Sequence, residues 1–252
     1  MKIASWNINS LRKRQDRLFE WLESFKPDIV CLQETKCTDD QFPALALEAA
    51  GYRSAFHGEK SYNGVAILSN SPIQEVRLSM GDGIVDPQAR VIAATIDNLR
   101  IYSIYAPNGQ SVGSTAYEYK LNWYARLRDC LRGEKIDRSI VCGDFNVAPE
   151  DRDLFDPELW RGAIMCSDAE RAAFRSIRDL GLRDTLRLHH PETGLFSWWD
   201  YRMLAFPKNR GLRIDAILAG ERLKCTNAGI DCEMRKGKEP SDHAPVWAEF
   251  EK

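Results

Sequence analysis

The sequence contains no pair of cysteines with the spacing that binds zinc. Its 252 residues include seven cysteines, an odd number, and no two of them are three positions apart. The odd count argues against a disulfide framework, and the missing Cys-x-x-Cys spacing argues against a zinc site. Free thiols persist in reducing compartments. We therefore expect the protein to be cytoplasmic.

Long apolar runs are also missing. No stretch approaches the roughly 18 residues that a membrane-spanning helix needs. The first seven residues become polar too early for a signal peptide. There is no low-complexity segment and no flexible linker, while 44% of the residues are hydrophobic, enough for a sizeable core. The chain should therefore form one large domain or two closely packed halves, without a membrane partner.

Neither sign of charge is in large excess. The 35 lysine and arginine residues are nearly balanced by 37 aspartate and glutamate residues, and the formal net charge is −2. This balance provides no overall attraction to nucleic acid. Any binding to a polyanion must depend on local basic patches.

The sequence does contain a regular alternation of short strands and amphipathic helices. Ser10 is a candidate N-cap for a helix over residues 11–25, and further helices are predicted near 42–50 and 114–132. Ser167 and Glu170 have capping-box spacing and open a helix that ends at Gly181. Apolar patterns predict strands near 2–8, 29–32, 52–57, 64–69, 73–79, 90–96, 99–105, 139–142, 195–199, 212–218, 225–232 and 246–250. This mixture predicts the α/β class.

The stretch 139–146 is the one around which the chain is organised. A short apolar strand is followed by Gly143, where the backbone can turn, and then by Asp144 and Asn146. Residues two apart in an extended segment point to the same side. A carboxylate and an amide at one strand end could hold a water or a metal against a phosphate. The simpler alternative is an ordinary turn, in which these residue types are common.

Other predicted strands end in similar polar groups. Glu34 follows an apolar strand, and its carboxylate suits Mg²⁺ or Mn²⁺, although alone it is more simply a charged turn residue. Asp215 lies among apolar neighbours, where an unpaired carboxylate would be costly. We therefore pair Asp215 with His243, which follows Asp242, as a hypothesis. An oriented histidine can donate to a phosphate oxygen, whereas a loop histidine in solvent is the alternative.

Two further groups have both a chemical and a structural interpretation. Tyr105 and Asn108 flank a proline turn and can hydrogen-bond a developing negative charge. Alternatively, they are a buried tyrosine and an Asn-Gly turn. Trp198 and Arg202 could form a wall for an unpaired nucleotide or sugar, with the arginine on a phosphate. The alternative is that this cluster belongs to the core and its rim.

Seven motifs, in order along the whole chain, resemble the exodeoxyribonuclease III family of DNA-repair nucleases. The motifs are Trp6-Asn7-Ile8-Asn9, Leu32-Gln33-Glu34-Thr35-Lys36, Asn63-Gly64-Val65-Ala66, Tyr105-Ala106-Pro107-Asn108-Gly109, Gly143-Asp144-Phe145-Asn146, Arg213-Ile214-Asp215 and Ser241-Asp242-His243-Ala244-Pro245. The stretches 196–202 and 209–215 further resemble the bacterial exonuclease III branch.

The resemblance implies a single domain over residues 1–252. Its fold would be a four-layer α/β sandwich, in which two mostly antiparallel sheets pack face to face and are flanked by helices. It also implies Mg²⁺- or Mn²⁺-dependent hydrolysis of double-stranded DNA, 5′ of abasic sites and at 3′ termini. We expect a monomer in the bacterial cytosol. The alternatives are another phosphodiesterase or phosphatase of the same fold, and a DNA-binding module without catalysis.

The resemblance also implies residue roles. Glu34 would hold the metal, helped by Asn7 and Asp242, with Asp144, Asn146 and His243 as further candidate ligands. Asp144 would position or deprotonate the attacking water, and Asn146 and His243 would hold the scissile phosphate. Asp215 would orient His243, while Tyr105 and Asn108 would stabilise the transition state. The expected DNA contacts are Arg90, Trp198, Arg202, Leu212 at a pocket wall, and Arg213.

Overall fold

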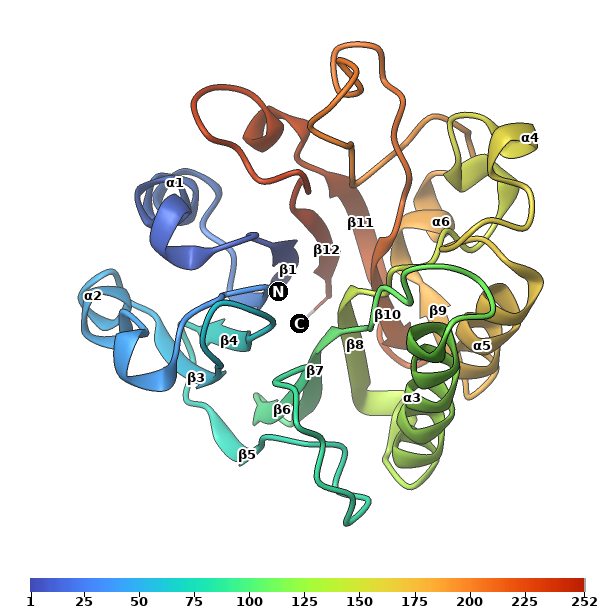
Figure 1. Cartoon of the computed structure of the whole chain (residues 1–252). Helices are drawn as coiled ribbons and strands as arrows, with labels where there is room; N and C mark the ends of the chain where they lie inside the picture. Colours follow the sequence, from blue (N-terminus) through green and yellow to red (C-terminus); the bar gives the residue numbers. More distant parts are fainter. Residues whose placement is uncertain (252) are drawn as a thin grey trace.

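The computed structural model describes residues 1–251, in which two six-stranded sheets pack face to face (Figure 1). The first sheet has the order β11-β12-β1-β2-β4-β3 and the second β5-β6-β7-β8-β10-β9. In each sheet one pair of strands, β1 with β2 and β7 with β8, is parallel, and the other pairs are antiparallel. The first sheet contains β1 (Lys2–Asn7), β2 (Ile29–Gln33), β3 (Arg53–His57), β4 (Val65–Ser69), β11 (Cys225–Ile230) and β12 (Val246–Phe250). The second contains β5 (Gln74–Arg77), β6 (Val91–Ile96), β7 (Leu99–Tyr105), β8 (Ser139–Asp144), β9 (Leu182–Asp184) and β10 (Asp215–Gly220).

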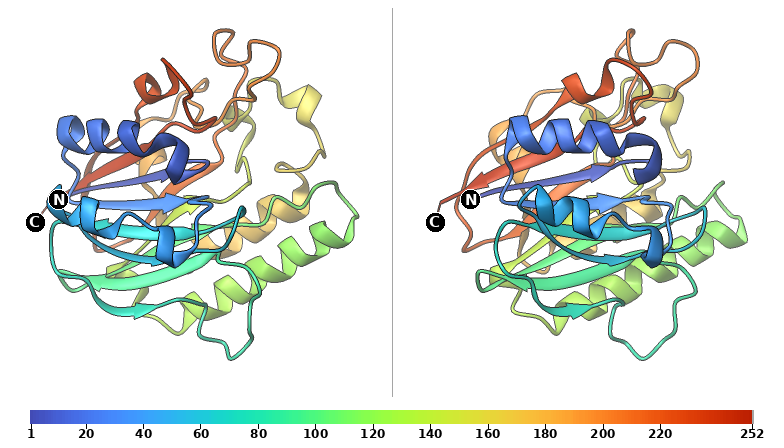
Figure 2. Two further views of the ribbon diagram at one scale, coloured as in Figure 1. Left: turned by 60° about the vertical axis from the view of Figure 1, so that its left-hand side comes forward. Right: turned by 90° about the vertical axis from the view of Figure 1, so that its left-hand side faces the viewer.

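Helices cover the outer face of each sheet. The first sheet packs against α1 (Leu11–Phe25) and α2 (Ala44–Ala49), and the second against α3 (Thr115–Arg132) and α5 (Asp168–Arg178). Figure 2 shows this layering from the side, with α1 and α3 on opposite outer faces. The expected four-layer sandwich is confirmed. None of the helices within residues 1–251 is long and apolar enough to cross a membrane.

The alternation of side chains along the strands explains why two sheets can share one interior. In β1, Ile3 faces the cluster between the sheets, whereas its neighbour Ala4 faces α1. The same alternation places Cys31 of β2 and Ile140 of β8 between the sheets. Because both faces of the central strands are covered, β2 and β8 are buried along their whole length, and β1 is buried except at its first residue.

Three local predictions need correction. Within the described chain, residues 195–199 form no strand, and Trp198 makes only isolated bridges to Leu212 and His243. The predicted strand over 212–218 begins only at Asp215, because the Ser197 hydroxyl accepts hydrogen bonds from the backbone N–H groups of residues 214 and 215. Ser10 precedes α1 but its side chain makes no capping hydrogen bond.

Other local features were confirmed or missed. The capping box of Ser167 and Glu170 is present at the start of α5. The short helices α4 (Pro157–Trp160) and α6 (Thr185–His189) and the three-residue strand β9 were not predicted. None of these elements is longer than five residues, too short for a clear hydrophobic period.

Two β-α-β units determine where polar side chains gather. The chain runs from β1 through α1 to β2, and again from β7 through α3 to β8. The two strands of each unit are parallel, so their carboxyl ends lie at one edge of the sheet. Ligand sites of α/β proteins commonly form at such edges.

Candidate active site

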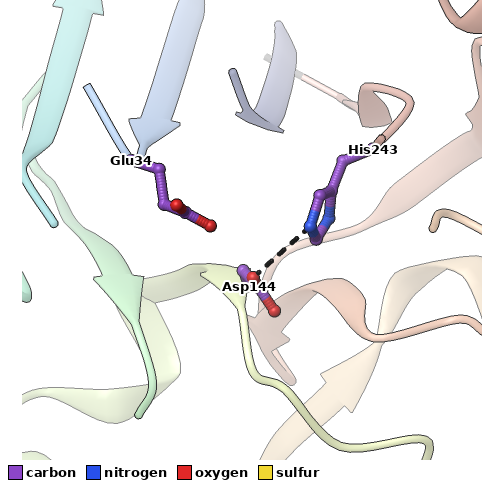
Figure 3. A group of neighbouring side chains, drawn as sticks. All are labelled: Glu34, Asp144 and His243. Atoms are coloured by element: carbon purple, nitrogen blue, oxygen red, sulfur yellow. Dashed lines mark ion pairs between the residues drawn. The ribbon is translucent and has the colours of Figure 1, made fainter. Parts of the chain in front are cut away.

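The ends of six strands bring the predicted polar residues to one place. Glu34 follows β2 and Asp144 ends β8, while His243 lies three residues before β12. Their side chains point toward one another (Figure 3). Asn7 ends β1 and Tyr105 ends β7, and Asp215 at the start of β10 pairs in register with Asp144. Residues separated by up to 236 positions therefore meet at one site.

Gly143 allows Asp144 to approach the neighbouring strand closely. Its φ is +151°, and a Cβ at this position would lie 1.9 Å from the carbonyl oxygen of Ile104 in β7. Any other residue would push β8 away from β7, since this contact is with backbone. The Asp144 carboxylate then accepts a hydrogen bond from the Asn146 backbone N–H at 2.8 Å. Gly143 is therefore required for the close packing of β8 against β7, in addition to any role in a turn.

Asn7 joins the two carboxylates of the site. Its Nδ2 donates to Glu34 at 2.8 Å and to Asp144 at 2.9 Å. Its Oδ1 accepts from the backbone N–H of Asn9 at 3.1 Å. Asn7 therefore holds the carboxylates in position, while its side-chain oxygen accepts a hydrogen bond from the Asn9 backbone.

His243 lies between two aspartates. Its Nδ1 is 2.8 Å from the Asp215 carboxylate and its Nε2 is 3.7 Å from Asp144, so the predicted pairing of Asp215 with His243 is present. The Ser197 hydroxyl also donates to Asp215 at 2.6 Å. Burial alone would lower the pKa of His243, but the carboxylates of Asp215 and Asp144 outweigh it and raise that pKa to about 10. A protonated His243 presents an N–H toward the site.

The environment of Asp144 is unusual for a carboxylate. Burial raises its pKa, His243 lowers it, Asp215 raises it, and the result is about 7. A carboxyl group with this pKa exchanges a proton near neutral pH. Perturbed groups of this kind mark candidate catalytic acids and bases.

Glu34, Asp144 and His243 form a candidate metal site. Each offers a ligand atom, and these atoms lie within 4.8 Å of one another, the only such group of acidic, histidine or cysteine residues found within residues 1–251. Two carboxylates suit a hard divalent cation. Glu34 also pairs with Lys36 at 2.7 Å. The Nδ1 of His243 is already held by Asp215, so the fit to a hard cation rests mainly on the two carboxylates.

Two predicted ligands have other partners. Both Asp242 oxygens accept hydrogen bonds, from Asn9 at 2.8 Å and from the Trp198 indole at 3.1 Å. Asn146 accepts from Asn108 at 3.2 Å and donates to the Ala106 carbonyl. Asp242 thus lies outside the group of three. The side-chain amides of Asn108 and Asn146 are linked by a hydrogen bond, and the two residues lie beside the group of three.

Tyr105 and Arg90 form a unit. The Arg90 guanidinium lies 4.7 Å from the centre of the Tyr105 ring and donates to the Tyr105 carbonyl. Burial and the carboxylates of Glu34 and Asp144 hold the pKa of Tyr105 well above its ordinary value, so its hydroxyl stays protonated. The expectation that Arg90 contacts DNA needs correction, because the side chain is buried against Tyr105.

Arg213 and Leu212 are also placed differently from the expectation. Arg213 is only 1% exposed and forms ion pairs with Asp153 and Asp184. Its guanidinium is therefore unavailable to a DNA phosphate. Leu212 is fully buried in a cluster against which Trp198 packs, so it does not itself line a pocket.

Trp198 and Arg202 remain accessible. Trp198 is half-buried beside Asp242, while the Arg202 side chain is 83% exposed and pairs with Asp200. The structure thus leaves these two of the five expected DNA contacts facing the surface.

A basic cleft that was not predicted from the sequence lies beside the site. Its volume is about 640 Å³, and its lining includes Arg12, Lys13, Arg14, Lys36 and Tyr201. The three consecutive basic residues 12–14, two positions after the first motif, were the available signal. Lys120, buried behind Asn108 and Asn146, was also missed. The available signal was a lysine at a position of the predicted helix where the pattern calls for an apolar residue.

Comparison with known proteins agrees with this geometry. The model of the endonuclease/exonuclease/phosphatase family matches residues 4–243. The chain belongs to this family. It is 37% identical to the exodeoxyribonuclease III of Haemophilus influenzae over 99% of this chain and 100% of that protein.

Two solved structures also cover the whole chain and are covered by it entirely. A 3′ phosphatase, NExo, from Neisseria, bound to a product DNA hairpin, superposes with a TM-score of 0.98 at 42% identity. An AP endonuclease from Archaeoglobus fulgidus superposes with a TM-score of 0.96 at 36% identity. The arrangement of both sheets is therefore shared with structures of DNA-processing enzymes.

Proposed function

We propose that this protein is a metal-dependent DNA-repair nuclease of the exodeoxyribonuclease III type. It would hydrolyse phosphodiesters of double-stranded DNA 5′ of abasic sites and at 3′ termini. The observation that carries this proposal is the meeting of Glu34, Asp144 and His243, with Asp215 behind the histidine. The names of similar proteins, including an exodeoxyribonuclease III and an AP endonuclease, support the same substrate class.

Glu34 and Asp144 would hold a divalent ion, Mg²⁺ or Mn²⁺. Their oxygens and the chemistry of hard cations fit this assignment. When bound, the ion would offset negative charge on the phosphate and stabilise the charge that develops during displacement. Asn7 keeps both carboxylates in place.

The remaining residues divide the other tasks of phosphoryl transfer. Asp144, buried at the end of β8 and facing His243 (Figure 3), would accept the proton of the attacking water. His243, held by Asp215, would donate its Nε2 proton to a phosphate oxygen. Tyr105 and the Asn108–Asn146 pair would donate hydrogen bonds to the phosphate oxygens in the transition state. Positioning and charge stabilisation are the main requirements of this chemistry.

The basic cleft would bind the DNA backbone. Arg12 and Lys13 replace Arg213 and Arg90 as our candidates for phosphate contacts, because they line an open cleft beside the site. Trp198 and Arg202 would also contact the substrate, as first expected. The protein would act as a monomer in the cytosol; both statements remain predictions, which size-exclusion chromatography and cell fractionation would check.

Cleavage of defined oligonucleotides tests the proposal. A duplex with one abasic site and a duplex with a 3′ phosphate are incubated with Mg²⁺, with Mn²⁺, and with a chelator. We expect incision or 3′ processing only with metal. Metal-dependent release of phosphate from small phosphoesters alone would favour another phosphodiesterase or phosphatase of this fold. Tight binding without cleavage would favour a non-catalytic module.

A further inference from the structure

Lys120 is a fully buried lysine directly behind the candidate active site. It lies on α3, on the face that carries Tyr117, Tyr124 and Leu127, and its side chain is 0% exposed. A buried ammonium group is costly unless it is paired and hydrogen-bonded. Its position therefore requires partners, and the partners lead to the site.

All three hydrogen bonds of the ammonium group are made. Nζ donates to the backbone carbonyl of Asn146 at 2.7 Å and to that of Asn108 at 3.1 Å, and it pairs with Glu170. Asn108 and Asn146 belong to different loops, which follow β7 and β8. One ammonium group thus joins the backbones of both residues whose side-chain amides also meet at 3.2 Å.

Glu170 connects this contact to α5. Its carboxylate accepts hydrogen bonds from the backbone N–H groups of Met165 and Ser167, at 3.0 and 3.1 Å, and from the Ser167 hydroxyl at 2.7 Å. Glu170 is fully buried and forms an ion pair with Lys120, and the negative charge of its carboxylate compensates the positive charge of the ammonium group. A lysine neutralised in this way fixes the loops without adding positive charge to the metal site.

The surrounding packing leaves Lys120 little freedom. A Cβ added at Gly109, where φ is +89°, would lie 3.0 Å from Cδ of Lys120. The loop after β7 therefore packs directly on the lysine side chain. Movement of Nζ would release both carbonyls, and the amides of Asn108 and Asn146 would lose their common orientation.

We propose that Lys120, held by Glu170, is a positioning residue that fixes Asn108 and Asn146 for transition-state binding. This inference rests on the proposed nuclease function. Lys120 makes no hydrogen bond or ion pair to Glu34, Asp144 or His243, and acts through two backbone carbonyls. Misplacement of a group by about 1 Å can reduce a rate 10²-fold. The effect should therefore appear in the rate of the chemical step more than in DNA binding.

A double-mutant cycle tests this role. The paired variant Lys120→Met with Glu170→Gln removes the ammonium group without leaving a buried charge, and it is combined with Asn146→Ala. Single-turnover cleavage of the abasic-site duplex, DNA affinity and melting temperature are measured for each protein. We expect the paired variant to reduce the cleavage rate about 10- to 100-fold, with DNA affinity nearly unchanged. In the Asn146→Ala background the same change should cost little more, because the Asn146 amide and the hydrogen bond by which it orients Asn108 are both already lost.

Arg187→Met provides the matched control. Arg187 is another buried cation, 6% exposed and paired with Asp153, but it makes no contact with the site. It should lower the melting temperature while leaving the rate per folded molecule unchanged. If the paired variant does not fold, Lys120→Arg takes its place, because the larger guanidinium keeps the charge and displaces the donors.

The outcomes separate this inference from the proposed function. Full additivity with Asn146→Ala, or a variant that only loses stability, would overturn the positioning role while wild-type cleavage still supports the nuclease. An absence of cleavage by the wild-type protein would overturn the proposed function itself. A rate loss that disappears in the Asn146→Ala background supports both.

Discussion

The two β-α-β units are built alike but supply different chemistry. The unit formed by β1, α1 and β2 delivers Asn7 and Glu34, and the unit formed by β7, α3 and β8 delivers Tyr105 and Asp144. The Glu34 side chain is 16% exposed, whereas that of Asp144 is 2% exposed. The partly solvated carboxylate suits a cation that must enter and leave. The buried one, with its raised pKa, suits proton transfer.

The helices of the two units also differ, in the basic residue that each places against the site. Arg14 of α1 donates to the backbone carbonyls of Ile8 and Asn9, as Lys120 of α3 does to those of Asn108 and Asn146. Arg14 uses only carbonyls and a tyrosine hydroxyl as partners, so its charge is not cancelled by a carboxylate there. Lys120 is neutralised by Glu170. The first unit thus presents positive charge to the cleft, and the second does not.

The largest expected effect is in the second unit. Asp144→Asn keeps the shape of the side chain but cannot accept a proton, so we expect the single-turnover rate to fall by about 10²- to 10⁴-fold. DNA binding should be retained, since Asp144 does not contact the cleft. The rate and the affinity are measured on the abasic-site duplex. Near-normal cleavage would show that Asp144 is not the base.

The next effect concerns the basic residue that sequence reasoning misplaced. Arg213→Ala leaves Asp153 and Asp184 buried with one partner removed, and should cost about 3–5 kcal/mol of unfolding free energy. Urea denaturation measures this loss. The salt dependence of DNA binding should stay unchanged. A stable variant with a reduced salt slope would restore Arg213 as a DNA contact.

The smallest effect concerns the first unit. Arg12→Ala should weaken binding to every duplex alike and reduce the slope of log affinity against log salt by about one unit. Fluorescence anisotropy between low and moderate salt would show it, with Arg202→Ala measured in parallel. An unchanged slope would remove Arg12 from the path of the DNA backbone.

These contrasts show what the sequence could reveal about the fold and the site. Long strands and helices were predictable, because their hydrophobic periods are set locally. The pairing of Asp215 with His243 was also predictable, because an unpaired carboxylate within an apolar run is costly. The layering of the two sheets depended on resemblance, since periodicity does not record which faces meet.

Long-range burial explains the errors. Arg213 stands next to a predicted site residue, but Asp153 and Asp184, which bury it, lie 60 and 29 positions away. The strand over 195–199 looked regular, yet the Ser197 side chain takes backbone donors that a ladder would have used. Lys120 looked like an ordinary charged helix residue, because its partners come from three other segments.

The dependence of the single-turnover rate on metal concentration tests the division of labour between the two units most directly. It is measured for the wild-type protein, Glu34→Ala and Asp144→Asn on the same abasic-site duplex. We predict that Glu34→Ala needs more Mg²⁺ or Mn²⁺ and then recovers part of the wild-type rate, because a ligand has been lost. Asp144→Asn should also need more metal, because it loses the other carboxylate of the site, but it should stay slow at every metal concentration, because its amide cannot accept a proton. Recovery of Asp144→Asn by metal, with Glu34→Ala unaffected by it, would contradict this account.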